Sequence, residues 1–128
     1  MATDLTVGLV NRPGSLLRAS EALGRSGVNI EGACGFVCEG QCVYHVLVED
    51  AEQARRALID AGFEIQAERR VALTPVEDQP GSAAAVLRRV ADAEVNLDLL
   101  YVTVDGRLVL SGEDVPAIRR ALAGPGSS

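Results

Sequence analysis

Two short loops carry the residue types in this sequence that are best suited to binding a small anion. The first is Asn11-Arg12-Pro13-Gly14-Ser15, and the second, Asp78-Gln79-Pro80-Gly81-Ser82, follows 67 residues later. Each comes after an apolar run and opens a helix-like run, and its Pro-Gly pair makes a tight turn that a ligand can approach closely. Free N–H groups at a helix start favour an anion such as a carboxylate. We therefore expect ligand binding at both loops, the alternative being that Pro-Gly only turns the chain.

A pair of asparagines repeats with the same spacing. Asn29 and Asn96, followed by Ile30 and Leu97, stand beyond the two helix-like runs and are again 67 residues apart. An asparagine side chain offers both a donor and an acceptor, so with the turn N–H groups it could hold the ammonium and the carboxylate of one small molecule. The alternative is that both asparagines only start their strands.

Three cysteines and the single histidine supply four zinc-ligand types within a short stretch: Cys34, Cys38, Cys42 and His45. If Glu39-Gly40-Gln41 is a three-residue turn, Cys38 faces Cys42 and His45 points to the opposite face of the hairpin. We therefore expect small buried thiols and no metal site. A Cys38–Cys42 disulfide under oxidation remains open.

Catalytic groups are sparse. The sequence has one histidine, and the pattern places no serine, cysteine or carboxylate as its partner. The carboxylates fall on expected turns and helix surfaces, such as Glu49-Asp50 and Glu113-Asp114, where capping explains them. We expect a protein that is not an enzyme and that needs no cofactor.

The elements that position these residues form a repeated pattern. In the first half we expect a strand at 5–10, a helix over 16–23, a hairpin of 28–38 and 42–49, a helix over 51–61 and a strand from 63. The second half repeats this order, with a strand at 70–76, a helix over 83–90, a hairpin turning at Asp105-Gly106 and a helix over 118–122. The sequence therefore predicts two α+β, ferredoxin-like βαββαβ repeats with antiparallel sheets, 1–68 and 69–128.

The second repeat lacks its last strand, because the helix near Ala123 is followed only by Gly124-Pro125-Gly126-Ser127-Ser128. In a ferredoxin-like sheet the last strand pairs with the first strand of its unit. We therefore expect the strand at 70–76 to have an open edge, and two such edges meeting about a two-fold axis would give a homodimer.

Composition excludes several partners. The formal charge of −6 and the pI of about 4.7 argue against nucleic acid and against an anionic membrane, since both bind basic surfaces. No apolar run approaches the length of about 18 residues that a membrane span requires. All basic residues except the histidine are arginine, which removes lysine chemistry. We expect a cytoplasmic protein with reduced thiols.

These motifs resemble the ACT domain, the amino-acid-sensing module of biosynthetic enzymes. The resemblance lies in Asn11-Arg12-Pro13-Gly14 followed by Gly27-Val28-Asn29-Ile30, and it is nearest to the regulatory domain of phosphoglycerate dehydrogenase. The second half, with Gln79-Pro80-Gly81 and Val95-Asn96-Leu97, is similar to another copy. The two copies cover nearly the whole chain, which therefore resembles a stand-alone tandem ACT protein.

The resemblance implies a regulatory protein that holds a free amino acid where two ACT units meet and that acts on a biosynthetic enzyme. It pairs Asn11 with Asn96, and Asp78 with Asn29. Serine-sensing relatives have a histidine where this sequence has Leu9, so we expect an aliphatic amino acid rather than serine. Two alternatives remain: an interaction module without a ligand, and an acylphosphatase-type hydrolase for which Arg12 is the one candidate in a phosphate-binding loop.

Overall fold

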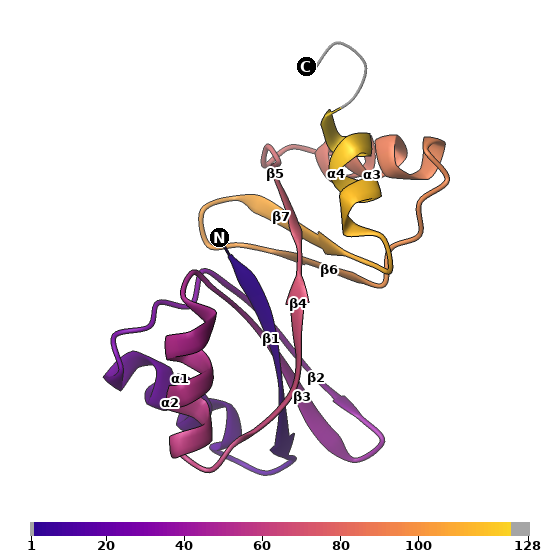
Figure 1. The fold of residues 1–128 in the computed structure, drawn as a ribbon. Helices are drawn as coiled ribbons and strands as arrows, with labels where there is room; N and C mark the ends of the chain where they lie inside the picture. The colour runs from indigo at the N-terminus through magenta and orange to yellow at the C-terminus, as the bar shows by residue number, and fades with distance from the viewer. Residues whose placement is uncertain (1, 124–128) are drawn as a thin grey trace. The chain divides into compact units, whose positions relative to one another are not determined.

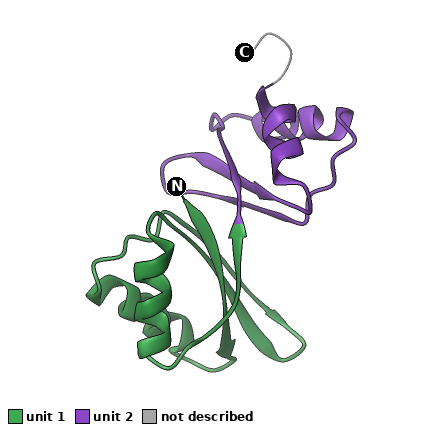
Figure 2. Ribbon diagram, viewed as in Figure 1, with its two compact units in different colours: residues 1–69 green, residues 70–128 purple. Residues whose placement is uncertain are grey.

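The computed structural model describes residues 2–123 (Figure 1). Contacts divide the chain into two compact units, Met1–Arg69 and Arg70–Ser128, which we call unit 1 and unit 2 (Figure 2). The boundary expected from the repeat lies one residue earlier. Within the described part of the chain, no helix is both long enough and apolar enough to cross a membrane.

Unit 1 has the ferredoxin-like arrangement expected from the sequence. Its elements are β1 (Thr3–Val10), α1 (Ser15–Arg25), β2 (Gly32–Cys38), β3 (Gln41–Val48), α2 (Ala51–Asp60) and β4 (Glu64–Arg70). The sheet order is β2-β3-β1-β4, so the two central strands are the first and third of the repeat. In Figure 1, α1 and α2 lie side by side against one face of this sheet. The two helices also contact each other, so together they form a single helical layer.

The core of unit 1 is formed by every second side chain along the central strands. Leu5, Val7 and Leu9 of β1 are buried against the helices, because successive side chains in a strand point to opposite faces. Ala19 and Leu23 of α1 meet them at helical spacing. Each fully buried aliphatic side chain contributes about 1.5–3 kcal/mol.

Unit 2 repeats this order with one strand fewer. Its elements are β5 (Ala72–Pro75), α3 (Ser82–Asp92), β6 (Leu99–Val102), β7 (Arg107–Ser111) and α4 (Val115–Ala123). The sheet order is β5-β7-β6, which places β5 at one end. Within residues 2–123 this sheet therefore has three strands, and residues 124–128, on which the prediction of a missing last strand rests, lie outside the described residues.

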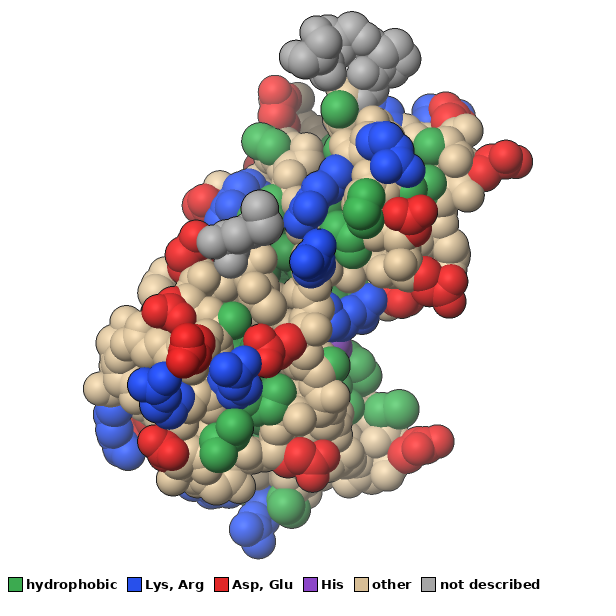
Figure 3. Space-filling model, viewed as in Figure 1, with side chains coloured by type: hydrophobic (Ala, Val, Ile, Leu, Met, Phe, Trp, Pro, Cys, Tyr) green, Lys and Arg blue, Asp and Glu red, His purple; other side chains and the backbone are tan. Residues whose placement is uncertain are grey.

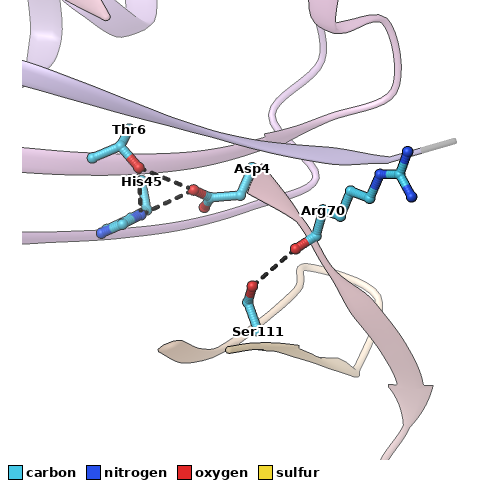
Figure 4. Close-up of polar contacts among 5 residues, drawn as sticks. All are labelled: Asp4, Thr6, His45, Arg70 and Ser111. Carbon is cyan, nitrogen blue, oxygen red and sulfur yellow. Dashed lines mark hydrogen bonds and ion pairs between the residues drawn. The ribbon is translucent and has the colours of Figure 1, made fainter. Parts of the chain in front are cut away.

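The open edge of unit 2 is shorter than we expected. The strand predicted over 70–76 is the four-residue β5, which ends at Pro75. Next to it, Arg119 donates from Nη2 to the carbonyl oxygen of Val71 at 2.9 Å, and the Ser111 hydroxyl donates to the carbonyl oxygen of Arg70 at 2.9 Å (Figure 4). Side chains of the same unit thus bind the carbonyls of the two residues that come just before β5.

The β2–β3 hairpin corrects one prediction. Its turn has two residues, Glu39 and Gly40, with φ values of 51° and 77°, and Cys38 pairs with Gln41. The predicted three-residue turn, with Cys38 facing Cys42, was wrong. Positive φ at both turn residues is typical of a type I′ turn, whose twist matches that of the flanking strands.

The one-residue change of register moves His45 to the other face of the sheet. Cys34 pairs with His45 across the strands, and the Phe36 ring stacks on the imidazole at 5.9 Å between ring centres. His45 therefore shares a face with Cys34 and Cys38, contrary to prediction, because side chains alternate with a period of two.

The cysteines are less buried than predicted. Cys42 alone is buried in the core, Cys34 is half-buried and Cys38 is exposed, and all three are free thiols. Within residues 2–123, no three of the His, Cys, Asp and Glu side chains are placed to hold a metal ion together.

The helices α1 and α3 end in the same cap. The Val28 N–H bonds the carbonyl of Leu23 at 2.9 Å, and the Val95 N–H bonds the carbonyl of Val90 at 3.2 Å, as in a Schellman motif. This cap keeps the following residues out of the sheet, so β2 and β6 begin only at Gly32 and Leu99. The predicted strand starts at the two asparagines were therefore wrong, and Asn29 and Asn96 lie in the connections.

The β6–β7 hairpin turns where the sequence predicted, at Asp105-Gly106. Gly106 has a φ of 82°, and the Thr103 N–H bonds the carbonyl of Arg107 at 2.8 Å. The Thr103 hydroxyl and the Arg107 guanidinium lower the pKa of the exposed Asp105 carboxyl below its usual value. The carboxylate form therefore supports this turn at neutral pH, and its support is lost as the pH falls through the lowered pKa.

The α3 cap predicts a stabilising substitution. Gly27 takes the left-handed position after α1 with a φ of 76°, whereas Glu94 takes the corresponding position after α3 with a φ of 57°. We expect Glu94→Gly to raise the free energy of unfolding by about 0.5–1 kcal/mol, because a side chain in this conformation is strained. Urea unfolding followed by circular dichroism measures the change. Ala91→Gly inside the helix is the control and should lower the free energy of unfolding by about 0.5–1 kcal/mol. If both substitutions changed the free energy of unfolding in the same direction, strain at Glu94 would not be the cause.

Candidate functional site

The first loop turns on a glycine in the left-handed conformation. Gly14, with a φ of 86°, precedes the first residue of α1. The Ser15 N–H bonds the carbonyl of Arg12 at 3.3 Å, and the Arg18 N–H bonds the carbonyl of Gly14 at 2.9 Å. The first N–H groups of the helix therefore point out of the end of α1 towards the loop.

The second loop has the same backbone. Gly81 has a φ of 87°, the Ser82 N–H bonds the carbonyl of Gln79 at 3.2 Å, and the Ala85 N–H bonds the carbonyl of Gly81 at 3.0 Å. The twin motifs of the sequence thus give twin turns. Any functional difference between the loops must come from side chains.

A pocket of about 630 Å³ opens beside the first loop. It contains all five residues of the predicted loop. The residues that line it are Val10, Asn11, Arg12, Pro13, Gly14, Ser15, Leu16, Leu17, Gly35, Phe36, Val37 and Cys42. One end is therefore polar and built from the loop, and the rest is apolar and built from α1, β2 and β3.

The residues of this loop play different structural roles. The Ser15 side chain is buried and its hydroxyl donates to the carbonyl of Val10 at 2.6 Å, so it closes the turn. Nη2 of Arg18 lies 3.4 Å from the Ser15 hydroxyl oxygen. Asn11 and Arg12 are exposed at the pocket, and Arg12 also lines a second hollow of about 330 Å³ together with residues of β1 and the residues just before β4. The polar end thus carries a guanidinium and an amide together with the helix N–H groups.

The second loop has different surroundings. A hollow of about 770 Å³ lies along α3, and Gly81 is its one residue from that loop. It is lined by Gly81, Ala84, Ala85, Leu87, Arg88, Arg89, Ala91 and Asp92. Asp78, Gln79 and Pro80 are exposed and outside this lining. The same turn therefore meets an apolar pocket in unit 1 and a helix surface in unit 2.

The remaining predicted residues lie away from their own loops. Asn29 follows α1, whose 11 residues span about 16 Å, and it is not among the residues that line the 630 Å³ pocket. Asn96 is also exposed beyond α3. Ile30 and Leu97 pack against the cores of unit 1 and unit 2. Within each unit, loop and asparagine therefore stand at opposite ends of a helix.

Sequence reasoning missed the apolar wall of the pocket. Gly35 lies beneath Leu16, and a Cβ placed at Gly35 would be 3.6 Å from the leucine Cδ2. Leu17 and Val37 are 61% and 55% exposed. No motif marks these residues, because the hairpin reaches the loop only through the pairing of β3 with both β1 and β2.

A second polar group lies on the sheet face of unit 1 away from the helices. Oδ1 of Asp4 is 3.0 Å from Nδ1 of His45, and the Thr6 hydroxyl donates to the same carboxylate oxygen at 3.2 Å (Figure 4). Asp4 is fully buried and His45 is 7% exposed. The Thr6 hydroxyl is also 3.3 Å from Nδ1.

This arrangement does not match a catalytic relay. A relay needs the carboxylate and the nucleophile on opposite nitrogens of the imidazole. Here the carboxylate of Asp4 and the hydroxyl of Thr6 both lie at Nδ1 of His45. Asp4, Thr6 and His45 therefore pair polar side chains across β1 and β3. The sequence did not predict this pairing, because 41 residues separate Asp4 from His45.

Charged side chains of both signs are mixed on the surface that Figure 3 displays. Acidic and basic groups lie side by side over each unit in that view, and the formal charge of the sequence is −6. A nucleic-acid interface needs a continuous basic surface. This charge distribution does not favour one.

No protein-family model and no curated protein sequence matches this chain, so the comparison rests on solved structures. Protein BT0572 from Bacteroides thetaiotaomicron superposes with a TM-score of 0.82 at 21% identity, over 94% of this chain and 85% of the other. The ligand-free regulatory subunit of aspartate kinase from Thermus thermophilus superposes with a TM-score of 0.70 at 20% identity, over 94% and 89%. The chain has the tandem ACT fold.

A third structure supports the same fold. The regulatory subunit of aspartate kinase from Thermus flavus gives a TM-score of 0.67 at 19% identity, over 94% of this chain and 90% of that one. The tandem ACT fold therefore extends over nearly the full length of each partner in these comparisons. At such identities the likeness concerns the fold, and the chemistry has to be argued from this chain's own residues.

The buried Asp4–His45 pair predicts a strong energetic coupling between the two side chains. We expect Asp4→Ala and His45→Ala each to lower the free energy of unfolding by about 3–5 kcal/mol, because each leaves a buried polar partner behind. The double variant should lose clearly less than the sum, which a double-mutant cycle by urea unfolding measures. The exposed Glu52–Arg56 pair on α2 is the control, with an expected coupling of about 0.3–0.5 kcal/mol. Additive losses at Asp4 and His45 would show that the pair does not interact.

Proposed function

We propose that this protein is a regulatory amino-acid-binding module whose ligand occupies the 630 Å³ pocket of unit 1. The observation that carries the proposal is the meeting of an open helix N-terminus at Gly14 with an apolar wall in the same pocket. A free amino acid has the matching chemistry, because it combines a carboxylate and an ammonium with a side chain. The resemblance to ACT domains implies the same class of ligand.

The polar end suits the ligand's charged groups. The N–H groups at the start of α1 and the guanidinium of Arg12 attract a carboxylate. The amide oxygen of Asn11 can accept a hydrogen bond from the ammonium, and its NH₂ can donate to the carboxylate. These contacts fix the orientation of the ligand in the pocket.

The apolar end suits an aliphatic side chain. Leu16, Leu17, Val37 and Cys42 present hydrocarbon and sulfur surface in this pocket. A hydroxyl placed against this wall would lose hydrogen bonds to water without replacement. We therefore propose a ligand of the leucine, isoleucine or valine class.

We propose further that another ACT-like unit completes the site. The pairing implied by the family resemblance joins Asn11 with Asn96, and Asp78 with Asn29, across two units. The separation of loop and asparagine within unit 1 is consistent with such sharing. The structural neighbours from the two Thermus species are regulatory subunits, which supports a regulatory role here, with a biosynthetic enzyme as the partner and no reaction of its own.

A thermal-shift screen of the free amino acids tests this proposal. We expect an aliphatic amino acid to raise the melting temperature, since a ligand at 100 times its Kd stabilises the native state by about 2.7 kcal/mol. Asn11→Ala should weaken binding by about 1–3 kcal/mol, because the variant loses hydrogen bonds to the charged groups of the ligand. Asp78→Ala is the matched control and should leave the affinity of the unit 1 site unchanged.

Derivatives of the ligand separate the two ends of the pocket. The methyl ester removes the carboxylate charge and the N-acetyl form removes the ammonium, so both should fail to shift the melting temperature. A flat screen would favour the interaction module without a ligand. Calorimetry that found two equal sites, weakened equally by Asn11→Ala and Asp78→Ala, would disprove the assignment to unit 1.

A further inference from the structure

We infer that the 330 Å³ hollow of unit 1 is a second binding site, whose ligand is a phosphate oxyanion: free phosphate or the phosphate group of a small monoester. The hollow is lined by the end of β1, the first loop, the start of α1, the first residue of β3 and the turn from α2 into β4. An amino acid in the 630 Å³ pocket is not needed for this site. The inference therefore does not rest on the proposed function.

Two guanidinium groups line the hollow, those of Arg12 and Arg18, and both side chains are exposed. Within residues 2–123 neither has a carboxylate partner, whereas Arg25 at the other end of α1 pairs with Glu21. A guanidinium carries N–H donors in a planar fork that matches two oxygens of one phosphate. Two such groups at one hollow favour an anion that accepts several charge-assisted hydrogen bonds.

The first loop holds the Arg18 guanidinium in place. Nη2 of Arg18 lies 3.4 Å from the Ser15 hydroxyl oxygen, and a Cβ placed at Gly14 would be 3.2 Å from Nη1. Ser15 is itself buried and fixed by its bond to the carbonyl of Val10. In the described part of the chain the Ser15 oxygen is the one hydrogen-bond partner of this guanidinium, so its other N–H groups remain for a ligand. Holding the side chain in advance lowers the entropy cost of binding.

Gln41 adds a neutral donor at the same hollow. Nε2 of Gln66 donates to Oε1 of Gln41 at 3.2 Å, which fixes the Gln41 amide. A Cβ placed at Gly8 would lie 3.0 Å from Nε2 of Gln41, so this nitrogen sits over the Gly8 backbone, which also lines the hollow. Among residues 2–123 the NH₂ group of Gln41 has no acceptor, and it is therefore available to a phosphate oxygen.

Charge and size narrow the ligand further. Glu64 is the one carboxylate in the lining, so the hollow has two positive groups against one negative group in a chain whose formal charge is −6. A volume of about 330 Å³ lies at the small end of the range of about 300–1,000 Å³ for small-molecule sites. This volume has room for more than a phosphate group, and the Glu64 carboxylate can accept hydrogen bonds from hydroxyl groups. We therefore expect the phosphate monoester of a small polyol to bind more tightly than free phosphate.

Isothermal titration calorimetry on the 128-residue chain, without amino acid, tests the inference. The probes are glycerol 3-phosphate, inorganic phosphate and glycerol, in a buffer that contains no phosphate or sulfate. We expect both phosphates to bind and glycerol not to bind. Arg12→Gln and Arg18→Gln should each raise the Kd of glycerol 3-phosphate by about tenfold or more, because each removes charge-assisted hydrogen bonds. Arg18→Lys should recover only part of this loss, since an ammonium keeps the charge without the fork of donors.

Arg25→Gln is the matched control, because it removes the same charge from the same helix outside the hollow. It should leave the Kd unchanged, as should Asn11→Ala, which alters the lining of the 630 Å³ pocket alone. Tighter binding of glycerol 3-phosphate than of phosphate identifies a monoester as the ligand, and equal binding identifies free phosphate. No binding of either phosphate, a Kd indifferent to Arg18→Gln, or an equal loss with Arg25→Gln would overturn the inference. Circular dichroism shows whether each variant is folded.

Discussion

The left-handed glycine just before the first helix of each unit is the constraint on which the site depends. Gly14 and Gly81 have φ values of 86° and 87°, which other residues adopt only under strain. This conformation lets the chain leave the strand and enter a helix almost at once. The helix then lies back along the sheet and buries its apolar face, while its first N–H groups stay at the loop. Fold and candidate site thus come from the same turn.

Because the two turns have one backbone geometry, the side chains around them decide what each can do. In unit 1 the loop meets Leu17 and Val37 and becomes one end of an apolar pocket. In unit 2 the corresponding helix position is Ala84, and the hollow there runs along α3. The two units therefore share one turn and differ in the side chains that surround it.

The sequence predicted the units well where a pattern is local. Pro-Gly loops, helical spacing at Leu16, Ala19 and Leu23, and the exact repeat of Asn29 at Asn96 were sufficient for the order of strands and helices in the two units. The prediction of the β2–β3 hairpin failed, because its outcome depends on a strand register that differs by one residue. A turn at Glu39-Gly40 and one with an added residue look alike in sequence, yet they place His45 on opposite faces of the sheet.

By itself the sequence determined the elements, their duplication and the two loops, because these depend on backbone preferences and on periodicity within a few residues. Only the tertiary structure decided what surrounds the loops. The pairing of β3 with both β1 and β2 brings Val37 to the loop and Asp4 to His45, over separations of tens of residues. Such contacts carry no local signal, since they depend on strand register and on the packing of side chains that are distant in the chain.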